Sequence, residues 1–186
     1  MRLVARGVVA AASLGVMPVQ AAGVGDQPFV TPQHDVDVTY AMLPGEAAAV
    51  ATQRLRWSSA LQAQRIDVPG APTYVVTDHR AHLTAAIRLD GHGVVTQAAP
   101  DSVPALGVTA SGGYVAVPGV AQAIAGLSCH EWQTRDAQGQ DTTLCLTDDG
   151  VLLRVRIGGR VLLLAQSVNG APLAPALFAI PGAKRG

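Results

Sequence analysis

Apolar and polar residues alternate along much of the chain, as expected for half-buried β-strands. Val36, Val38 and Tyr40 alternate with polar neighbours, and Leu55 and Trp57 alternate with two arginines. No segment shows the three-and-four spacing of apolar residues that a long amphipathic helix would need. The chain is therefore predicted to consist mainly of β-strands.

Turn residues divide this pattern into short strands. Pro69 and Gly70 form one such turn. Leu83, Ala85 and Ile87 are predicted to share one face of a hairpin arm. The predicted strands in this part of the chain are residues 36–40, 54–57, 62–68, 73–77, 82–88 and 94–97.

Three segments depart from the strand pattern. Residues 46–53, EAAAVATQ, are rich in alanine and predict a short helix. Residues 98–113 combine two prolines with three glycines and predict a long loop. Near the C-terminus, residues 171–176 predict a loop, and a short closing strand follows at Leu177, Phe178 and Ile180.

A glycine pair predicts the clearest hairpin. Gly158 and Gly159 separate two apolar runs, and such a pair favours a two-residue turn. In the symmetric register, the facing pairs are Val155 with Leu162 and Leu153 with Leu164. This register places five apolar residues on one inward face: Leu153, Val155, Ile157, Leu162 and Leu164.

The number of strands determines the predicted fold class. Roughly seven to nine antiparallel strands on one domain need a curled sheet, because an open flat sheet would leave long edges exposed. We therefore predict a mainly β fold with little helix. Its curved antiparallel sheet is either an open half-barrel or a closed barrel.

The N-terminus predicts an export signal that is removed. Arg2 and Arg6 precede a short apolar run, and Val19 and Ala21 suit the positions before a signal-peptidase cut. The run is shorter than the roughly 20 residues of a spanning helix. The predicted parts are a signal peptide at 1–21, an N-terminal extension at 22–34 and a single β domain at 35–186. The mature protein would be periplasmic and at most peripheral to the membrane.

The two cysteines suit that oxidising compartment. Cys129 and Cys145 stand in strand-like arms around a polar turn at 136–141. A turn centred near Ala137 sets them opposite each other on one face of the hairpin, where their Cβ atoms approach closely. The chain has no C-x-x-C spacing, so a structural disulfide is favoured over a buried free pair or a redox pair.

Composition excludes some classes of protein. Residues of the set AVILMFWYC make up 49% of the chain, which disfavours disorder. Once Arg2 and Arg6 are removed with the signal, 11 basic residues face 13 acidic ones. The chain therefore lacks the clustered lysines and arginines that grip nucleic acid, and we predict no nucleic-acid partner.

Catalytic and metal motifs are missing. The sequence contains no Gly-x-Ser-x-Gly, His-Glu-x-x-His, Walker or Gly-x-Gly-x-x-Gly motif. His79 and His82 bracket one turn, whereas His92 lies about 30 Å away at the far end of the next strand, by the rise of roughly 3.3 Å per residue. Asp35 and Asp37 fit a solvated strand edge better than a paired-carboxylate site. No catalytic residue, metal or cofactor is predicted.

Trp57, Tyr74 and Trp132 are three of only seven aromatic residues. Stacking of carbohydrate or single-stranded nucleic acid is therefore disfavoured. These rings either fill the widest layer of the core or line a cavity between the curled sheet and its cover. The rim of such a cavity would carry three arginines: Arg54, Arg56 and Arg65.

Three motifs stand out in the second half of the chain: Gly126, Cys129 and Trp132, then Cys145, Thr147, Asp149 and Gly150, and finally Phe178 and Pro181. Together they resemble the motifs of a family of small exported bacterial proteins that form a domain of unknown function. These proteins look similar in strand order to the outer-membrane lipoprotein carriers. The likeness covers about residues 36–185 and implies a curved antiparallel sheet, partly covered by helix, in the periplasm. It transfers no catalytic residue.

These observations lead to two functional hypotheses. The first is a non-enzymatic periplasmic protein that holds an apolar ligand, or a hydrophobic segment of an envelope protein, on the concave face of its sheet. The alternative is a small accessory subunit that stabilises a membrane-bound periplasmic oxidoreductase or transport complex. The predicted ligand-binding residues are Trp57, Tyr74, Trp132, Leu153, Val155, Leu162 and Leu164.

Overall fold

The structure is a computed structural model that describes residues 27–43, 50–98, 113–135 and 139–182. These residues form a 12-stranded antiparallel sheet in the order β6-β5-β4-β3-β2-β1-β12-β11-β10-β9-β7, with β8 paired to β9. The strands are β1 Val36–Met42, β2 Ala51–Ser58, β3 Ala63–Asp67, β4 Thr73–Asp78, β5 Leu83–Arg88, β6 Val94–Ala98, β7 Val115–Ala116, β8 Gln122–Ile124, β9 Leu127–Arg135, β10 Asp141–Leu146, β11 Leu152–Ile157 and β12 Arg160–Asn169.

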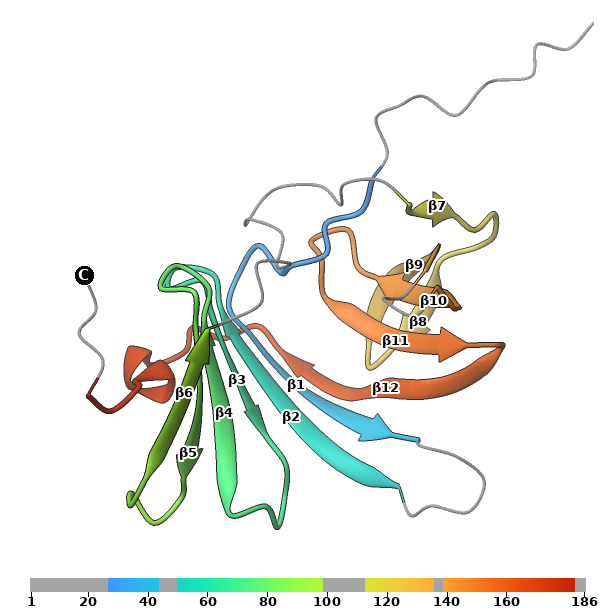
Figure 1. The fold of residues 1–186 in the computed structure, drawn as a ribbon. Helices are drawn as coiled ribbons and strands as arrows, with labels where there is room; N and C mark the ends of the chain where they lie inside the picture. The colour runs from blue at the N-terminus through green and yellow to red at the C-terminus, as the bar shows by residue number, and fades with distance from the viewer. Residues whose placement is uncertain (1–26, 44–49, 99–112, 136–138, 183–186) are drawn as a thin grey trace, which may run out of the picture.

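The sheet is curved and open, so the half-barrel of the two predicted forms is confirmed (Figure 1). Successive strands turn back on each other from β1 to β6 and again from β9 to β12, and β12 returns to pair with β1. This pairing joins the two series of strands into one curved layer. Within the described residues, no helix has the length and apolar character needed to cross a bilayer.

Most predicted strands are present, and the strand count was too low. The hairpin of β4 and β5 is confirmed, with Ala85 fully buried and Ile87 3% exposed. The predicted helix at EAAAVATQ is wrong where it is described, because residues 51–53 belong to β2 and pair with β1. Cross-strand pairing there overrides the helical preference of alanine. Residues 46–49 of that prediction, and 99–112 of the predicted loop, lie outside the described residues.

The predicted closing strand is also wrong. Pro175–Phe178 forms a 3-10 helix, η1, with Phe178 fully buried and Leu177 N–H bonded to the carbonyl oxygen of Ala174 at 3.0 Å. It packs on β3 and β4 across the face of the sheet instead of pairing at an edge. In the described part of the chain η1 is the only helix, so the helical cover implied by the resemblance is not found there.

The Gly158-Gly159 hairpin forms in the predicted register for its first two pairs, but the register is wrong beyond them. Both glycines have positive φ, at 56° and 81°, as a primed turn requires. A bulge between Val155 and Arg156 then shifts the pairing by one residue on β12. Leu162 and Leu164 therefore lose their predicted partners. Beyond the bulge, the facing pairs are Val155 with Leu163 and Arg154 with Leu164.

The disulfide between Cys129 and Cys145 is confirmed, whereas their facing arrangement is wrong. Cys145 pairs with Glu131, so the bridge joins diagonal neighbours with Cα atoms 5.4 Å apart. Asp141 faces Arg135, so the hairpin register is centred one residue later than the predicted centre near Ala137. Both half-cystines are almost fully buried.

The strand registers place apolar residues on both faces of the sheet. On the concave face, Val36 and Val38 of β1 lie opposite Trp57 and Leu55 of β2. The convex face carries a second apolar cluster: Ala63, Val76, Ala85 and Ile87, packed against Phe178 and Ile180. The C-terminal segment, residues 171–182, therefore covers the convex face of β3 to β5.

Charged residues cross the convex face beside this cluster. Asp37 of β1 pairs with Arg54 of β2, whose Nε lies 2.8 Å from Oδ1. Arg56 lies between Asp37 and Asp67, at 3.6 and 3.4 Å. Arg65 binds Asp67 at 2.8 Å and donates to the carbonyl oxygen of Leu177 at 3.3 Å. These arginines therefore pair with carboxylates on the convex face, and their predicted position at a cavity rim is wrong.

We predict that the disulfide contributes strongly to stability. Replacing both Cys129 and Cys145 by Ser should lower the free energy of unfolding by about 3 kcal/mol, because the bridge closes a loop that spans 16 positions. In a thermal melt this should lower the midpoint by several degrees. Reduced wild-type protein should melt like the double variant. Equal midpoints for the variant and the oxidised wild type would contradict a stabilising role.

Candidate functional site

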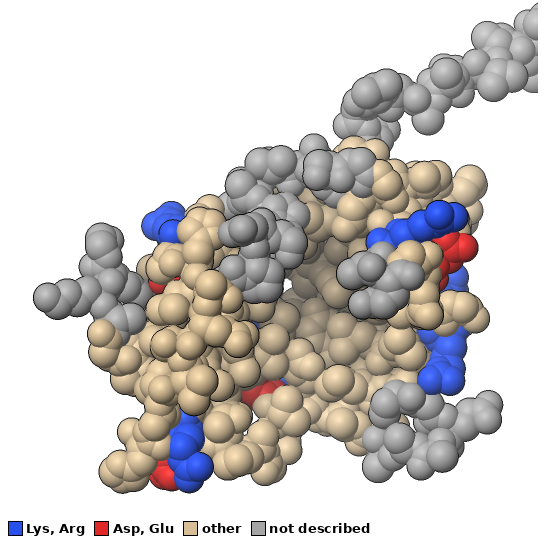
Figure 2. All heavy atoms as spheres, viewed as in Figure 1, with Lys and Arg blue, Asp and Glu red and all other residues tan. Residues whose placement is uncertain are grey.

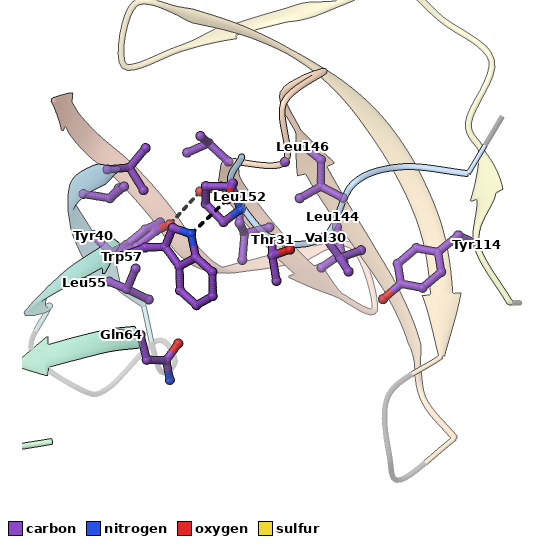
Figure 3. Close-up of a pocket in the computed structure, with 15 residues that line it drawn as sticks. Val30, Thr31, Tyr40, Leu55, Trp57, Gln64, Tyr114, Leu144, Leu146 and Leu152 are labelled. Atoms are coloured by element: carbon purple, nitrogen blue, oxygen red, sulfur yellow. Dashed lines mark hydrogen bonds between the residues drawn. The ribbon is translucent and has the colours of Figure 1, made fainter. Parts of the chain in front are cut away.

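A cavity of about 380 Å³ opens on the concave face of the sheet. Figure 2 shows the hollow, whose visible walls are mostly neither acidic nor basic. The cavity lies between β1–β2 and β10–β11, and the N-terminal segment, residues 27–35, forms part of its wall (Figure 3). Among the described residues, no charged side chain lines it.

Strands β1 and β2 supply one wall, on which two aromatic rings are fixed by hydrogen bonds. The Tyr40 hydroxyl donates to the carbonyl oxygen of Leu152 at 2.7 Å, and the Trp57 indole N–H donates to the carbonyl oxygen of Pro32 at 2.9 Å. Burial raises the pKa of Tyr40, so the phenol stays protonated. With their polar atoms bonded, both rings present apolar surface to the cavity.

Strands β10 and β11 supply the opposite wall. Leu144 and Leu146 line the cavity, whereas Cys145 between them points to the other face, as alternation along a strand requires. Leu152 pairs with Leu146 and joins the same wall. The disulfide thus lies behind a wall of leucines and anchors β10 to β9.

The N-terminal segment closes the third side. Its backbone is held by a hydrogen bond from Gln33 N–H to the carbonyl oxygen of Asp149 at 3.1 Å. Gly150, with φ of 90°, lets the segment approach closely, because a Cβ there would lie 2.8 Å from the Thr31 carbonyl carbon and 3.0 Å from the Phe29 Cβ. Only glycine fits this position without moving the segment.

Asp35 ties the N-terminal segment to the turn after β2 and to the C-terminal segment. One carboxylate oxygen accepts a hydrogen bond from Ser59 N–H and the other from Leu173 N–H, each at 2.9 Å. Desolvation by burial opposes ionisation, but these hydrogen bonds outweigh it and hold the pKa of Asp35 below its ordinary value. The charged carboxylate therefore fixes the start of β1 against the C-terminal segment.

The structure separates the predicted aromatic residues. Trp57 lines the cavity. Trp132 lines a separate, more polar groove of about 610 Å³ between β9 and Phe29. Tyr74 lies on the convex face, where the Arg65 guanidinium sits 3.7 Å from its ring centroid and stabilises the ring by a cation–π contact.

The predicted aliphatic residues are also dispersed. Leu153 is fully buried in the core. Val155 shares a face with Leu144, its partner on β10, but does not line the cavity. Leu162 lies at the bulge, and Leu164 faces the same side as Arg154. The single apolar ladder that was predicted on β11 and β12 is therefore absent.

Sequence reasoning missed most of the cavity wall. Leu144 and Leu146 could have been identified, because residues that alternate with a buried half-cystine point to the opposite face. The wall formed by Val30, Thr31 and Pro32 carries no periodic pattern and could not have been found in this way. Within the described residues, no group of three or more His, Cys, Asp and Glu side chains is placed to hold a metal ion.

Comparison with known proteins yields similarity of fold. No protein-family model and no curated protein matches the chain. An uncharacterized conserved protein from Thermus thermophilus matches at 15% identity over 81% of this chain and 87% of its own, with a TM-score of 0.51. The MucA/MucB complex of Pseudomonas aeruginosa matches at 16% identity over 80% of this chain, with a TM-score of 0.52.

A structure of MucB in complex with MucA(peri) gives a similar match, at 17% identity over 81% of this chain, with a TM-score of 0.51. In both MucB complexes the matched region spans 56% of the other chain, so this protein corresponds to little more than half of it. At these identities the likeness establishes a shared fold.

We predict that Asp35→Asn destabilises the protein in a pH-dependent way. An amide has one acceptor oxygen, so one backbone N–H loses its partner, at a cost of about 1–2 kcal/mol at pH 7. The folded-state pKa of Asp35 lies below 3.8. The carboxylate's contribution to the free energy of unfolding is therefore present above that pH and is lost as the pH falls further.

Thermal melts from pH 7 to pH 3 should therefore show the gap between wild type and variant narrowing on acidification. Asp148→Asn is the control, because that side chain is 94% exposed and should change the midpoint little. A gap that is constant or widens towards low pH would contradict the assigned role of Asp35.

Proposed function

We propose that the protein is a periplasmic, non-enzymatic binding protein that holds an apolar group in the concave cavity. The group belongs to a small apolar ligand or to a hydrophobic segment of another envelope protein. The observation that carries the proposal is a cavity of about 380 Å³ with a fixed aromatic wall, a leucine wall and no charged lining among the described residues. This volume lies at the lower end of the roughly 300–1,000 Å³ typical of ligand pockets.

The energetics support binding of a modest apolar group. A ligand that buries about 200 Å² of apolar surface would gain about 5 kcal/mol at roughly 25 cal/mol per Å², before the entropic cost of association is subtracted. Because Tyr40 and Trp57 are already held by hydrogen bonds, little additional ordering of this wall is needed on binding. We therefore expect reversible, moderate affinity.

The chemistry of the lining supports binding without reaction. The lining side chains are hydrocarbons, aromatic rings, one amide and a few hydroxyl groups. Burial raises the pKa of both Tyr40 and Tyr114, which keeps the phenols neutral near pH 7. No general acid, base or activated nucleophile is offered to a bound molecule by these residues.

The fold comparison supports a protein as one source of the apolar group. Two of the solved structures with this fold are complexes of MucB with MucA or MucA(peri). The predicted export signal would bring this chain into the same compartment as envelope proteins.

Native mass spectrometry of protein purified from the envelope should show either a bound small molecule or a co-purifying polypeptide.

We predict that filling the cavity abolishes binding of an apolar probe. Diphenylhexatriene, a fluorescent hydrocarbon, should bind the purified protein, and Leu55→Trp should weaken its affinity at least tenfold because the larger ring occupies the cavity. Leu144→Phe adds a smaller ring from the opposite wall and should also weaken binding of the probe. It takes the place of Leu55→Trp in the test if that variant fails to fold.

The matched control is Val95→Trp on β6, where the side chain is 72% exposed and lies outside the cavity. This variant should bind the probe like wild type. Thermal melts should confirm that each tested variant is folded. Wild-type affinity in folded Leu55→Trp and Leu144→Phe variants, or an equal loss in Val95→Trp, would refute the cavity as the binding site.

A further inference from the structure

Strand β6 forms an open edge of the sheet. It stands at one end of the strand order, and among the described residues no strand lies beyond it (Figure 1). Its sequence, VVTQA, contains no charged residue and no proline, and its pairing with β5 runs without a bulge. Val95 in this strand is 72% exposed. Charges, prolines and bulges normally prevent an edge strand from pairing with another chain, so β6 lacks that protection.

The opposite edge of the sheet is protected. Strand β7 has only two residues, and Pro118, which has no main-chain N–H, follows shortly after it. The side chain of Gln27 donates to the carbonyl oxygen of Tyr114, just before this strand, at 3.2 Å. A short strand and a nearby proline both disfavour pairing with another chain. Of the two ends of the described sheet, β6 is therefore the one open to a further strand.

The main chain of β6 directs alternate residues away from the sheet. Arg88 N–H bonds to the carbonyl oxygen of Gly93 at 3.2 Å, and this pair continues the register of β5 and β6. Hydrogen-bonded and non-hydrogen-bonded pairs alternate in an antiparallel ladder, so Val95 and Gln97 are the residues of β6 that bond to β5. The residues whose N–H and C=O groups point outward are Val94, Thr96 and Ala98.

A second copy of the same edge can pair with all of these outward groups. Two antiparallel β6 strands related by a two-fold axis at Thr96 place Thr96 opposite Thr96, and Val94 opposite Ala98 of the second copy. Each of these facing pairs exchanges two main-chain hydrogen bonds. An axis at Val95 would instead place Ala98 opposite His92, outside the strand. Facing threonines are a favourable pair, and β6 has no charged residue that would meet a like charge.

The concave faces of both copies would lie on the same side of the joined sheet, because facing residues of antiparallel strands share a face. An apolar row already crosses the concave face from Leu55 in the cavity wall to Val95 at the edge, by way of Ile66, Val75 and Ala86. In the joined sheet, Val95 would lie diagonal to Val95 of the second copy. The two rows would therefore meet and cover this exposed valine.

We infer that β6 is a dimerisation edge, at which two copies of this chain pair through antiparallel β6 strands about a two-fold axis at Thr96. This inference goes beyond the proposed binding function and does not depend on it. The paired strands are short and bury less than the roughly 1,200 Å² of a stable interface. The dimer is therefore weak and reversible, with a Kd on the order of 100 µM.

Sedimentation velocity of the chain without its predicted signal peptide tests the dimer. Between about 10 and about 500 µM, the weight-average mass should rise towards that of a dimer, by mass action. Thr96→Lys and Thr96→Asp should each stay monomeric, because like charges would face each other across the axis. An equimolar mixture of the two variants should dimerise again, with an affinity at least tenfold higher than that of either variant alone.

The matched control is Val115→Lys, which adds the same charge at the protected edge, where the side chain is 65% exposed. This variant should dimerise like wild type. Thermal melts should confirm that each variant is folded. Wild-type protein that remains monomeric at the highest concentration overturns the inference. Folded Thr96 variants that dimerise like wild type, or a mixture that does not dimerise, overturn it as well.

Amide hydrogen exchange of wild-type protein locates the pairing without any substitution. The N–H groups of Val95 and Gln97 bond to β5, so they should exchange slowly at every concentration. The N–H of Thr96 should exchange about threefold more slowly at the highest concentration than in dilute protein, because pairing of the two copies protects it. A dimer in which the exchange of Thr96 does not depend on concentration overturns the inference.

Discussion

A single curved sheet with apolar residues on both faces has to be covered on both sides. The described residues provide no second sheet and only one short 3-10 helix for this purpose. The segments that flank the sheet provide the cover instead: the N-terminal segment lies on the concave face and the C-terminal segment on the convex face. Both segments meet at Asp35, whose carboxylate bonds to Ser59 and Leu173. Apolar burial therefore depends on how these two segments are held.

The two faces differ because their covers differ. On the convex face, Phe178 and Ile180 fill the space over β3 to β5. Ion pairs of Arg56 with Asp37 and of Arg65 with Asp67 lie beside them on β1 to β3. On the concave face, one extended segment crosses a wider curve between β2 and β10 and leaves a cavity. We therefore propose ligand binding on the concave face, where the covering segment is too narrow to fill the space above the sheet. Gly150 sets how close that cover can come.

Local patterns predicted the strands and the disulfide, but not the surfaces they form. Alternation from Val36 to Tyr40 and the turn residues after β4 identify elements because one face of each strand is buried. Residues 161–164 are all apolar, so no alternation of apolar and polar residues shows where the bulge lies. The register of this hairpin could therefore not be obtained from sequence. Similarly, Thr31 and Pro32 lie in a segment without periodicity, whose position depends on contacts with Asp149 and Trp57 far along the chain.

The central claim is that an apolar ligand lies between the β1–β2 wall and the β10–β11 wall. Nuclear Overhauser contacts between diphenylhexatriene and leucine methyl groups in specifically labelled protein test it most directly. We expect contacts from one bound probe to Leu55 and to Leu144, which belong to opposite walls. Contacts confined to Leu83 on the convex face, or to the exposed leucines Leu89 and Leu127, would contradict it.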